Sequence, residues 1–318
     1  MRAVQVRGPG DVELAEVPRP EPGPGEVLVR VETAAICATD RRLALRGADT
    51  LRIPGHEAAG HLEDGSPVGV HPDVGCGRCE DCRSGFVNRC ADRRSIGLDQ
   101  DGCFAEWVAV PAVHAVSLEA VNLGIAPLLE PLACCLHAIQ LLKVRPGTRA
   151  LVVGAGSMGV LCMWALKAAG AVVAVVQRSE PRRRMALELG ADAALGPEDD
   201  PQRHLGTSPE VAVVTAAGVE ALVWALKRVA QGGRVHAFAG TPGGAFVDAN
   251  LVHYRHVALL GSTGSTVADY VRARDLVATG ELSLDPLPRT EVSLSGAPGA
   301  LLADQDPAVL KTMVSVSR

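Results

Sequence analysis

The stretch Leu151-Val152-Val153-Gly154-Ala155-Gly156-Ser157-Met158-Gly159 decides the fold of this 318-residue chain. Apolar β-formers run into the first glycine and a helix-like pattern follows the second, which predicts a strand, a tight turn and a helix. In a G-x-G-x-x-G loop at such a place, the first glycine makes the turn, the second lets the backbone approach a pyrophosphate, and the third packs helix against strand. We therefore predict a dinucleotide-binding loop formed by Gly154, Gly156, Ser157, Met158 and Gly159.

Strand-like and helix-like segments alternate around this loop. The alternation is typical of βαβ units and predicts an α/β fold with a doubly wound parallel sheet, a Rossmann domain, over residues 121–265. Ligands of such sheets bind outside the carboxyl ends of the strands, so Thr215 and Ala216 are expected beside the cofactor. The expected strands are Ala150–Val153, Val172–Val176, Val211–Val214 and Val235–Ala239, and the expected helices are Met158–Ala169 and Pro181–Leu189.

The end of the second of these strands bears on the choice of cofactor. An acidic residue there would hold the ribose 2′-hydroxyl of NAD, but this chain has Gln177, Arg178 and Ser179, with Arg182 close behind. An arginine can pair with a 2′-phosphate and a serine can donate a hydrogen bond to it. We therefore expect NADP to be preferred over NAD, with a solvated helix face as the alternative interpretation of the arginines.

The first 120 residues have a different pattern. Short β-branched runs at Val27–Val31 and Trp107–Val110 are separated by glycine- and proline-rich stretches such as Pro18–Gly25, which predicts a β-rich domain over residues 1–120. The tail, 266–318, combines a helix candidate at Val267–Thr279 with short strands, and we expect it to pack back on the first domain.

Four of the nine cysteines form a cluster with the spacing C-x2-C-x2-C-x7-C: Cys76, Cys79, Cys82 and Cys90. Two-residue gaps let successive thiolates converge on one ion, and four cysteines suit tetrahedral Zn²⁺ in a closed, structural site. Free buried thiols and an iron–sulfur cluster are the alternatives. Because such a site leaves no open position on the metal, we expect it to hold a loop and do no chemistry.

Composition excludes several classes of protein. Charged residues make up 21% and hydrophobic residues 47% of the chain, the net charge is −5 and aromatics reach only 3%, so neither disorder nor a nucleic-acid partner is expected. No apolar run approaches the roughly 18 residues of a membrane span, so no membrane association is expected. The opening stretch has no hydrophobic signal region, and clustered cysteines are typical of metal binding in a reducing compartment, so we expect a cytoplasmic location.

Further donors are scattered through the sequence. Cys37, His56, Glu57 and Glu130 are ordinary one by one, since a lone cysteine or histidine is usually a core residue. Together they offer one sulfur, one nitrogen and up to two carboxylate ligands. Three protein ligands and an open position are the composition of a catalytic zinc site.

With these motifs, the sequence resembles the zinc-dependent alcohol dehydrogenases of the medium-chain dehydrogenase/reductase superfamily over nearly its whole length. The Glu-Pro-Leu form of the segment that begins at Glu130 is most similar to the polyol, sugar and threonine dehydrogenase branches. The motifs that carry the resemblance are Cys37-Ala38-Thr39-Asp40, Gly55-His56-Glu57, the four-cysteine loop, Asp101-Gly102-Cys103-Phe104-Ala105-Glu106, Glu130-Pro131-Leu132-Ala133, the glycine loop and Leu189-Gly190-Ala191-Asp192.

The resemblance implies a fold and roles for particular residues. The fold would be a GroES-like, β-rich catalytic domain with a Rossmann domain inserted before its last elements, assembled as a homodimer or homotetramer. Cys37, His56 and Glu130 would bind the catalytic zinc, and Glu57 would be a nearby carboxylate able to enter or leave its ligand set. Thr39 would begin a proton relay, and Asp40 would orient His56.

The implied activity is hydride transfer between NADP(H) and an alcohol or carbonyl substrate, such as a polyol, sugar or secondary alcohol, with two zinc ions per chain. A zinc-free enone or quinone reductase of the same superfamily and a non-catalytic NADP-binding zinc protein are the alternatives. Three departures from the family pattern concern the substrate pocket and the outer proton path. The stretch 61–70 is short, Cys103 stands where glycine is common, and Arg42 stands where some members have a relay histidine.

Overall fold

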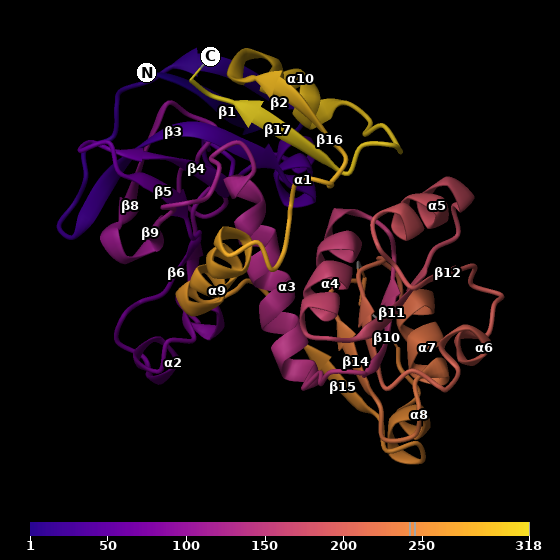
Figure 1. Ribbon diagram of the computed structural model, residues 1–318. Coiled ribbons are helices and arrows are strands. Elements are labelled where there is room, and N and C mark those ends of the chain that lie inside the picture. The colour runs from indigo at the N-terminus through magenta and orange to yellow at the C-terminus, as the bar shows by residue number, and fades with distance from the viewer. Residues whose placement is uncertain (242, 245, 318) are drawn as a thin grey trace. The chain divides into compact units, whose positions relative to one another are not determined.

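The computed structural model describes residues 1–241, 243–244 and 246–317. The chain crosses between two units twice: the first unit contains Met1–Ala133 and Gly264–Arg318, and the second contains Cys134–Thr263. The sequence predicts boundaries at 120 and 265, with the C-terminal segment returning to the first domain. An α/β architecture with one β-rich unit and one Rossmann-type unit is observed (Figure 1).

The second unit is built on a six-stranded parallel sheet with the strand order β12-β11-β10-β13-β14-β15. Every strand predicted from the sequence here is confirmed to within two residues at either end. The strands are β10 (Arg149–Val153), β11 (Val172–Val176), β12 (Ala193–Leu195), β13 (Val211–Val214), β14 (Arg234–Ala237) and β15 (Ala258–Gly261). The helices are α4 (Ser157–Ala168), α5 (Glu180–Glu188), α6 (Pro201–Leu205), α7 (Val219–Arg228) and α8 (Ala249–His253).

The strand order places the glycine loop at the point where the sheet changes winding direction. Strand β10 has β11 on one side and β13 on the other, so the crossovers before and after it run in opposite senses. Helix α7 packs its Leu222, Ala225 and Leu226 on one face of the sheet, and α4 lies on the opposite side (Figure 1). Because helices cover both faces, the central strands are continuously apolar, which is why their sequence does not alternate.

The first unit contains a seven-stranded sheet with the order β16-β17-β3-β4-β5-β9, in which β8 also pairs with β3. Its strands are β3 (Glu26–Ile36), β4 (Glu57–Leu62), β5 (Pro67–Val70), β8 (Trp107–Pro111), β9 (Ala115–Ser117), β16 (Arg289–Ser293) and β17 (Lys311–Ser315). Two further pairs are β1 (Arg2–Gly8) with β2 (Asp11–Glu16) and β6 (Asp73–Val74) with β7 (Arg94–Ser95).

Helices cover and connect these strands. They are α1 (Ala38–Arg46), α2 (Glu80–Arg83), α3 (Leu129–Leu142), α9 (Val267–Ala278) and α10 (Ala297–Leu302), with short 3-10 helices at Val87–Arg89, Ala112–His114, Ala126–Leu128 and Leu294–Gly296. None of the helices in the described ranges is long and apolar enough to cross a membrane.

The C-terminal strand β17 is the feature of this sheet that matters most for the site. It pairs antiparallel with β3, and β3 pairs antiparallel with β4 on its other edge. The register puts Met313 opposite Ala35, and Ala35 opposite Glu57. Directly paired residues share a face of a sheet, and so do residues two apart along a strand. Lys311 therefore stands on the same face of the sheet as Glu57.

Candidate active site and metal centres

The first candidate metal centre lies where β3 ends and β4 begins. One ligand atom from each of Cys37, His56 and Glu57 lies within 4.8 Å of the others. Cys37 follows β3 and caps the N-terminus of α1, while His56 and Glu57 follow a turn at Gly55. The pairing of β3 with β4 thus brings a thiol, an imidazole and a carboxylate together, which are the donor types that Zn²⁺ takes.

Asp40 organises this group from the first turn of α1. It is fully buried, and its Oδ2 accepts a hydrogen bond of 2.8 Å from the backbone N–H of Cys37. Its Oδ1 lies 3.0 Å from Nδ1 of His56 and also accepts from the backbone N–H of Gly55 at 3.3 Å. If His56 donates its Nδ1 proton to this carboxylate, its Nε2 lone pair is free to bind a metal.

The electrostatics of His56 agree with that arrangement. Burial lowers its pKa, but the negative charges of Asp40 and Cys37 outweigh burial and raise the pKa well above the ordinary value. The negative charges that favour a proton on His56 also favour a metal cation bound to this ring instead of the proton. The fourth predicted donor, Glu130, is buried in the first turn of α3 and is close enough to raise the pKa of Lys311 and Tyr270.

Lys311 is a residue of this site that the sequence reasoning missed. Its Nζ lies 2.6 Å from Oε1 and 2.6 Å from Oε2 of Glu57, and the two side chains are only 3% and 1% exposed. Burial lowers the pKa of Lys311, but Glu57 and Cys37 reverse that and raise the pKa, so the amine is held as ammonium. A buried carboxylate needs a positive charge beside it, but no local pattern in the sequence shows that this charge comes from a residue 254 positions away.

Two other residues, Thr39 and Cys103, lie near this group of donors. The Oγ1 atom of Thr39 accepts a hydrogen bond of 3.0 Å from the Arg42 guanidinium, which is exposed. Cys103 is fully buried, and its burial raises the pKa of the thiol to about 12. Among the described residues, the gathered donor atoms belong to Cys37, His56 and Glu57, and Cys103 is not one of them.

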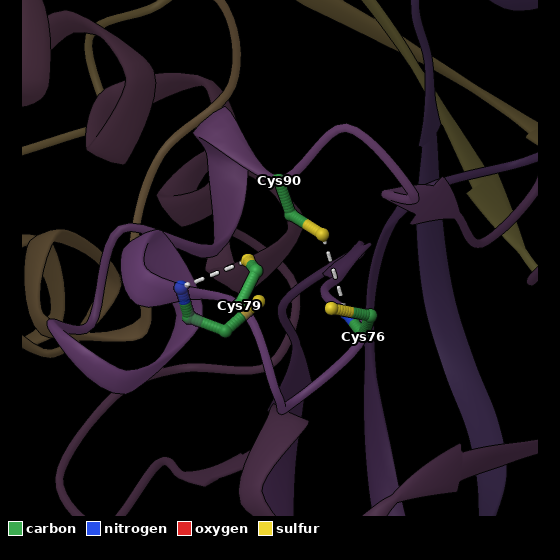
Figure 2. Close-up of side chains that lie close together, drawn as sticks. Cys76, Cys79 and Cys90 are labelled. Atoms are coloured by element: carbon green, nitrogen blue, oxygen red, sulfur yellow. Dashed lines mark hydrogen bonds between the residues drawn. The ribbon is translucent and has the colours of Figure 1, made fainter.

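The four predicted cysteines of the second centre do come together. One Sγ from each of Cys76, Cys79, Cys82 and Cys90 lies within 4.8 Å of the others, in a loop between β6 and β7, and Figure 2 shows the first, second and fourth of them. The backbone N–H of Cys76 points at Sγ of Cys90, and that of Cys82 at Sγ of Cys79, both at 3.4 Å. Such N–H contacts stabilise thiolate charge.

Local backbone makes this convergence possible. A Cβ at Gly75 would lie 2.5 Å from Sγ of Cys82, so only glycine fits there. Hydrogen bonds from Arg78 and Cys79 lower the pKa of Cys76 to about 6, while burial and Cys79 raise that of Cys82 to about 12. Four neighbouring thiols cannot all ionise without a cation, and a divalent metal would supply that charge.

The glycine loop of the second unit has the geometry of an anion cradle. Gly154 has φ +114°, and a Cβ there would approach Oγ1 of Thr215 to 2.7 Å. A Cβ at Gly159 would lie 2.0 Å from the carbonyl oxygen of Gly154, so helix and strand touch at that point. Only an arginine nitrogen at 3.9 Å comes near a Cβ at Gly156. That open space lies at the N-terminus of α4, where Ser157 and Met158 begin the helix and where a pyrophosphate binds in such folds.

The end of β11 leaves two of the predicted ribose-side residues accessible. The Oε1 atom of Gln177 accepts from the backbone N–H groups of Arg178 and Ser179 at 2.7 and 3.3 Å, and the side chains of Arg178 and Ser179 are exposed. Arg182 donates to the carbonyl of Ala155 at 3.2 Å and so spans the glycine loop. Arg183, in contrast, donates to the carbonyls of Gln177 and Arg178.

Thr215 and Ala216 follow β13 and close against the end of β10. Both backbone N–H groups donate to the carbonyl of Val153 at 2.9 Å, and Oγ1 of Thr215 donates to the same oxygen at 3.1 Å. The structure thus places these two residues beside the first glycine of the loop, at the carboxyl edge of the sheet.

Known proteins share both halves of this arrangement. The family model described as an alcohol dehydrogenase GroES-like domain matches residues 23–120, and the one described as a zinc-binding dehydrogenase matches residues 157–279. The chain is similar to an L-threonine 3-dehydrogenase of Pyrococcus horikoshii, at 32% identity over 90% of each chain. It is also similar to an L-galactonate-5-dehydrogenase of Escherichia coli, at 31% identity over 84% of each chain.

Solved structures resemble it over the whole length. A putative zinc-binding dehydrogenase from Sinorhizobium meliloti 1021 bound to NADP superposes with a TM-score of 0.91 at 30% identity, covering 99% of each chain. A thermostable alcohol dehydrogenase from Pyrobaculum aerophilum with cobalt and zinc bound has a TM-score of 0.88 at 27% identity, again covering 99% of each chain. The chain belongs to the zinc-dependent alcohol dehydrogenases of the medium-chain dehydrogenase/reductase superfamily, and it is an NAD(P)-dependent oxidoreductase.

Proposed function

We propose that this enzyme transfers a hydride between NADP(H) and a small polyol, sugar or secondary alcohol, using one zinc ion for chemistry and a second for structure. The observation that carries the proposal is the buried group of Cys37, His56 and Glu57, held together by Asp40 at the end of β3. A donor set with one thiol, one imidazole and nearby carboxylates fits an open zinc site. Glu130, buried beside the group, supplies the third ligand.

Zinc held there by these residues would supply a Lewis acid that lowers the pKa of a substrate hydroxyl, and a bound nicotinamide would supply the hydride acceptor or donor. Residues of the chain orient the reacting groups and carry the substrate proton away. Asp40 keeps His56 in one orientation and one tautomer. Thr39 is half-buried beside Cys37 and carries the hydroxyl through which the substrate proton leaves. Arg42 cannot accept that proton, because a guanidinium stays charged, so the proton passes from Thr39 to water.

The relatives support the proposed substrate class. Their names specify threonine and galactonate as substrates, both small molecules with a hydroxyl group to oxidise. The glutamate in the Glu-Pro-Leu segment at 130–132 resembles the polyol and threonine branches. A panel of polyols, sugars, amino alcohols and aldehydes, each offered with NADP and with NAD, identifies the substrate and the direction.

Loss of the metal-binding thiol tests the proposed chemistry. We expect Cys37→Ser to lose the zinc of the open site and essentially all turnover, while NADP affinity and the four-cysteine zinc remain, because the glycine loop is in the other unit. The measurements are metal analysis, which should give about two zinc per chain before and one after substitution, cofactor titration and activity on the panel. Cys103→Ala is the matched control, since this cysteine is not one of the gathered donors.

Full activity in Cys37→Ser would contradict the proposal. One zinc per wild-type chain, with tight cofactor binding and no turnover on any substrate, would favour a non-catalytic NADP-binding protein instead. No zinc at the open site with enone reduction would favour the zinc-free reductases.

The preference for NADP has its own test. Arg178 is exposed at the end of β11, and Gln177 stands at the position where an acidic residue would repel a 2′-phosphate. A hydrogen-bonded ion pair of this kind contributes about 1.5–3 kcal/mol. We therefore expect Arg178→Ala to weaken NADP binding about tenfold or more and to leave NAD binding nearly unchanged. Arg184→Ala, which removes an equally exposed arginine facing Glu180, is the control, and equal losses for both cofactors would refute the assignment.

We also infer a homodimer or homotetramer in the cytoplasm. Strand β15 is an edge of the parallel sheet, and its Leu259 is 38% exposed. An edge strand with free backbone groups and an apolar side chain is suited to pairing with a second copy. Light scattering on the purified protein measures the number of chains.

A further inference from the structure

A cavity of about 430 Å³ lies within the first unit, and none of the residues proposed to bind zinc lines it. Its walls are formed by strands β1 and β8, the segment after β2 and the loop before β8. Most of the lining side chains are apolar, among them Val17, Ile53 and Val108. A cavity of this size, with mostly apolar walls and a few polar groups, is typical of small-molecule sites.

Gln5 brings a side-chain amide to this cavity from strand β1. Its neighbour Val4 packs in the main hydrophobic core of the unit, and side chains alternate along a strand, so Gln5 points to the other face. On that face Ala3, two residues away, packs with Ile53 and Ala105. Gln5 is only 9% exposed, and within the described part of the chain its side-chain amide has no hydrogen-bond partner.

A buried amide without a partner calls for an explanation. Buried polar groups in native proteins are nearly always hydrogen-bonded, because an unpaired amide that has left water costs free energy. An apolar side chain would occupy this position of β1 without that cost. Because the amide of Gln5 faces a cavity and not a packed wall, we expect its partner to be a molecule that enters the cavity.

The charged groups around the cavity already have opposite charges beside them. Arg19 lies 2.6 Å from Oε1 of Glu63, and Asp101 lies 3.6 Å from the guanidinium of Arg52. The N-terminal ammonium donates to a backbone carbonyl at 2.7 Å and lies 3.4 Å from a glutamate. A charged ligand would therefore meet no unbalanced charge here, whereas the neutral amide of Gln5 is available.

Flat, rigid surfaces border the cavity. Trp107 lines it from β8, and the guanidinium of Arg19 lies 3.7 Å from the centre of the indole ring, which holds that ring in place. Pro18 and Pro20 contribute stiff apolar surface from the segment after β2. Such walls favour a ring over a flexible chain, because a rigid ligand loses little conformational entropy on binding.

We propose that this cavity is a second small-molecule site, which binds an uncharged ring compound with an adjacent N–H and C=O, as in a lactam, through the side chain of Gln5. The amide of Gln5 has a carbonyl acceptor and N–H donors side by side. Its carbonyl accepts from the ligand N–H, and its N–H donates to the ligand carbonyl. The site does not depend on the proposed hydride transfer, and either can fail without the other.

Two matched lactams test the proposal on the full, zinc-loaded chain. The probes are δ-valerolactam and its N-methyl derivative, in which a methyl group replaces the N–H. Binding is followed by NMR titration up to about 20 mM, because so small a ligand binds weakly. Gln5→Leu removes the amide and keeps an apolar side chain of similar length. Gln140→Leu, at an exposed position of α3, is the matched control.

We expect wild-type protein to bind δ-valerolactam at least about tenfold more tightly than the N-methyl derivative, because methylation leaves the carbonyl of Gln5 unpaired. Gln5→Leu should bind δ-valerolactam at least about tenfold more weakly than wild type and should no longer distinguish the two lactams. Gln140→Leu should behave as wild type.

The comparison of the two lactams on wild-type protein needs no variant, so it decides even if Gln5→Leu folds poorly. Equal affinities of the two compounds for wild-type protein would overturn the proposal, because the amide would then not read the N–H. The absence of binding of both would also overturn it, and the cavity would then hold only ordered water.

Discussion

Asp40 uses its two carboxylate oxygens for different purposes. One oxygen closes the first turn of α1 by accepting from Cys37, and the other holds the ring of His56. The same residue thus fixes two of the predicted metal donors, one through its backbone and one through its side chain. An Asp three residues after a helix start is an ordinary capping residue in a sequence. Its second contact appears only when β4 is brought beside it.

The three glycines of the dinucleotide loop differ in what replacing them would do. A Cβ at Gly159 would meet the Gly154 carbonyl at 2.0 Å, whereas one at Gly156 would meet nothing closer than 3.9 Å. We expect Gly159→Ala to destabilise the protein by about 1–3 kcal/mol through overpacking. Gly156→Ala should leave stability almost unchanged and weaken cofactor binding at least about tenfold, because its methyl group occupies the space that the pyrophosphate approaches.

Urea unfolding and cofactor titration on the two variants separate these effects. Gly206, which has open space around it in a positive-φ turn after α6, is not a suitable comparison, since strain would confound it. Gly299, with negative φ and nothing near its Cβ, serves as the matched Gly→Ala control. If the Gly156→Ala variant bound NADP normally, the loop would not be part of the cofactor site.

At the scale of elements, sequence patterns predicted the second unit better than the first. Its strands are covered on both faces, so continuous apolar runs such as Val172–Val176 mark them directly, and β11 has those bounds. In the first unit the pairing of β17 with β3 joins residues almost the length of the chain apart. No local propensity encodes that pairing, which is set by competition among strands for one sheet.

The same limit explains what was missed at the site. Cysteine spacing identified the four-cysteine centre because all of its donors lie in one loop. The open group was identified from donor types and resemblance, and its geometry requires the end of β3, the start of β4 and the first turn of α3. Lys311 lies outside every motif. A lysine at the start of an apolar strand is ordinarily an edge residue, so nothing in the sequence marks it as buried. Its burial follows from tertiary packing alone.

The four-cysteine loop makes a prediction at this scale. It lies between the two short strands β6 and β7 and has only one-turn helices of its own, so the metal supplies much of its order. We expect Cys90→Ser to lose one zinc and to expose the amides of residues 75–94 to exchange, while the seven-stranded sheet stays protected. Hydrogen exchange by mass spectrometry measures this, with Cys134→Ser as control. Unchanged protection of the loop would mean that the metal does not hold it.

Across the whole molecule, buried neutral histidines occur in both units. In the first, Nδ1 of His71 and Nδ1 of His114 are 3.0 Å apart, and Nε2 of His71 lies 3.1 Å from the carbonyl of Ser265. With its proton on Nε2, His71 donates to that carbonyl and its Nδ1 accepts from Nδ1 of His114, while Oγ of Ser265 lies 3.3 Å from the same Nε2. A second proton on His71 would occupy Nδ1 and remove the acceptor of this pair. In the second unit, His236 is fully buried and faces Oγ of Ser262 at 3.0 Å.

These histidines make stability depend on pH in a defined window. Burial lowers the pKa of His71 and of His236 to about 4, from 6.5, and burial also lowers that of His114. The unfolded chain therefore binds protons below pH 6.5 that the folded chain refuses until about pH 4, so the free energy of unfolding falls as the pH drops through this range. One pKa unit corresponds to about 1.4 kcal/mol per group. His71 and His236 thus each contribute on the order of a few kcal/mol of acid sensitivity.

Urea unfolding at a series of pH values between 7.5 and 4.5 tests the expectation on metal-loaded protein. Metal loading matters because the raised pKa of His56 acts in the opposite direction in the metal-free protein, and a bound metal keeps that imidazole neutral. His236→Asn keeps a polar group toward Ser262 and removes one titrating ring, so it should flatten the slope. Replacing the exposed His253 should leave the slope as it is. Stability that is constant or rises toward pH 5 would mean that these rings accept protons in the folded state, which their burial opposes.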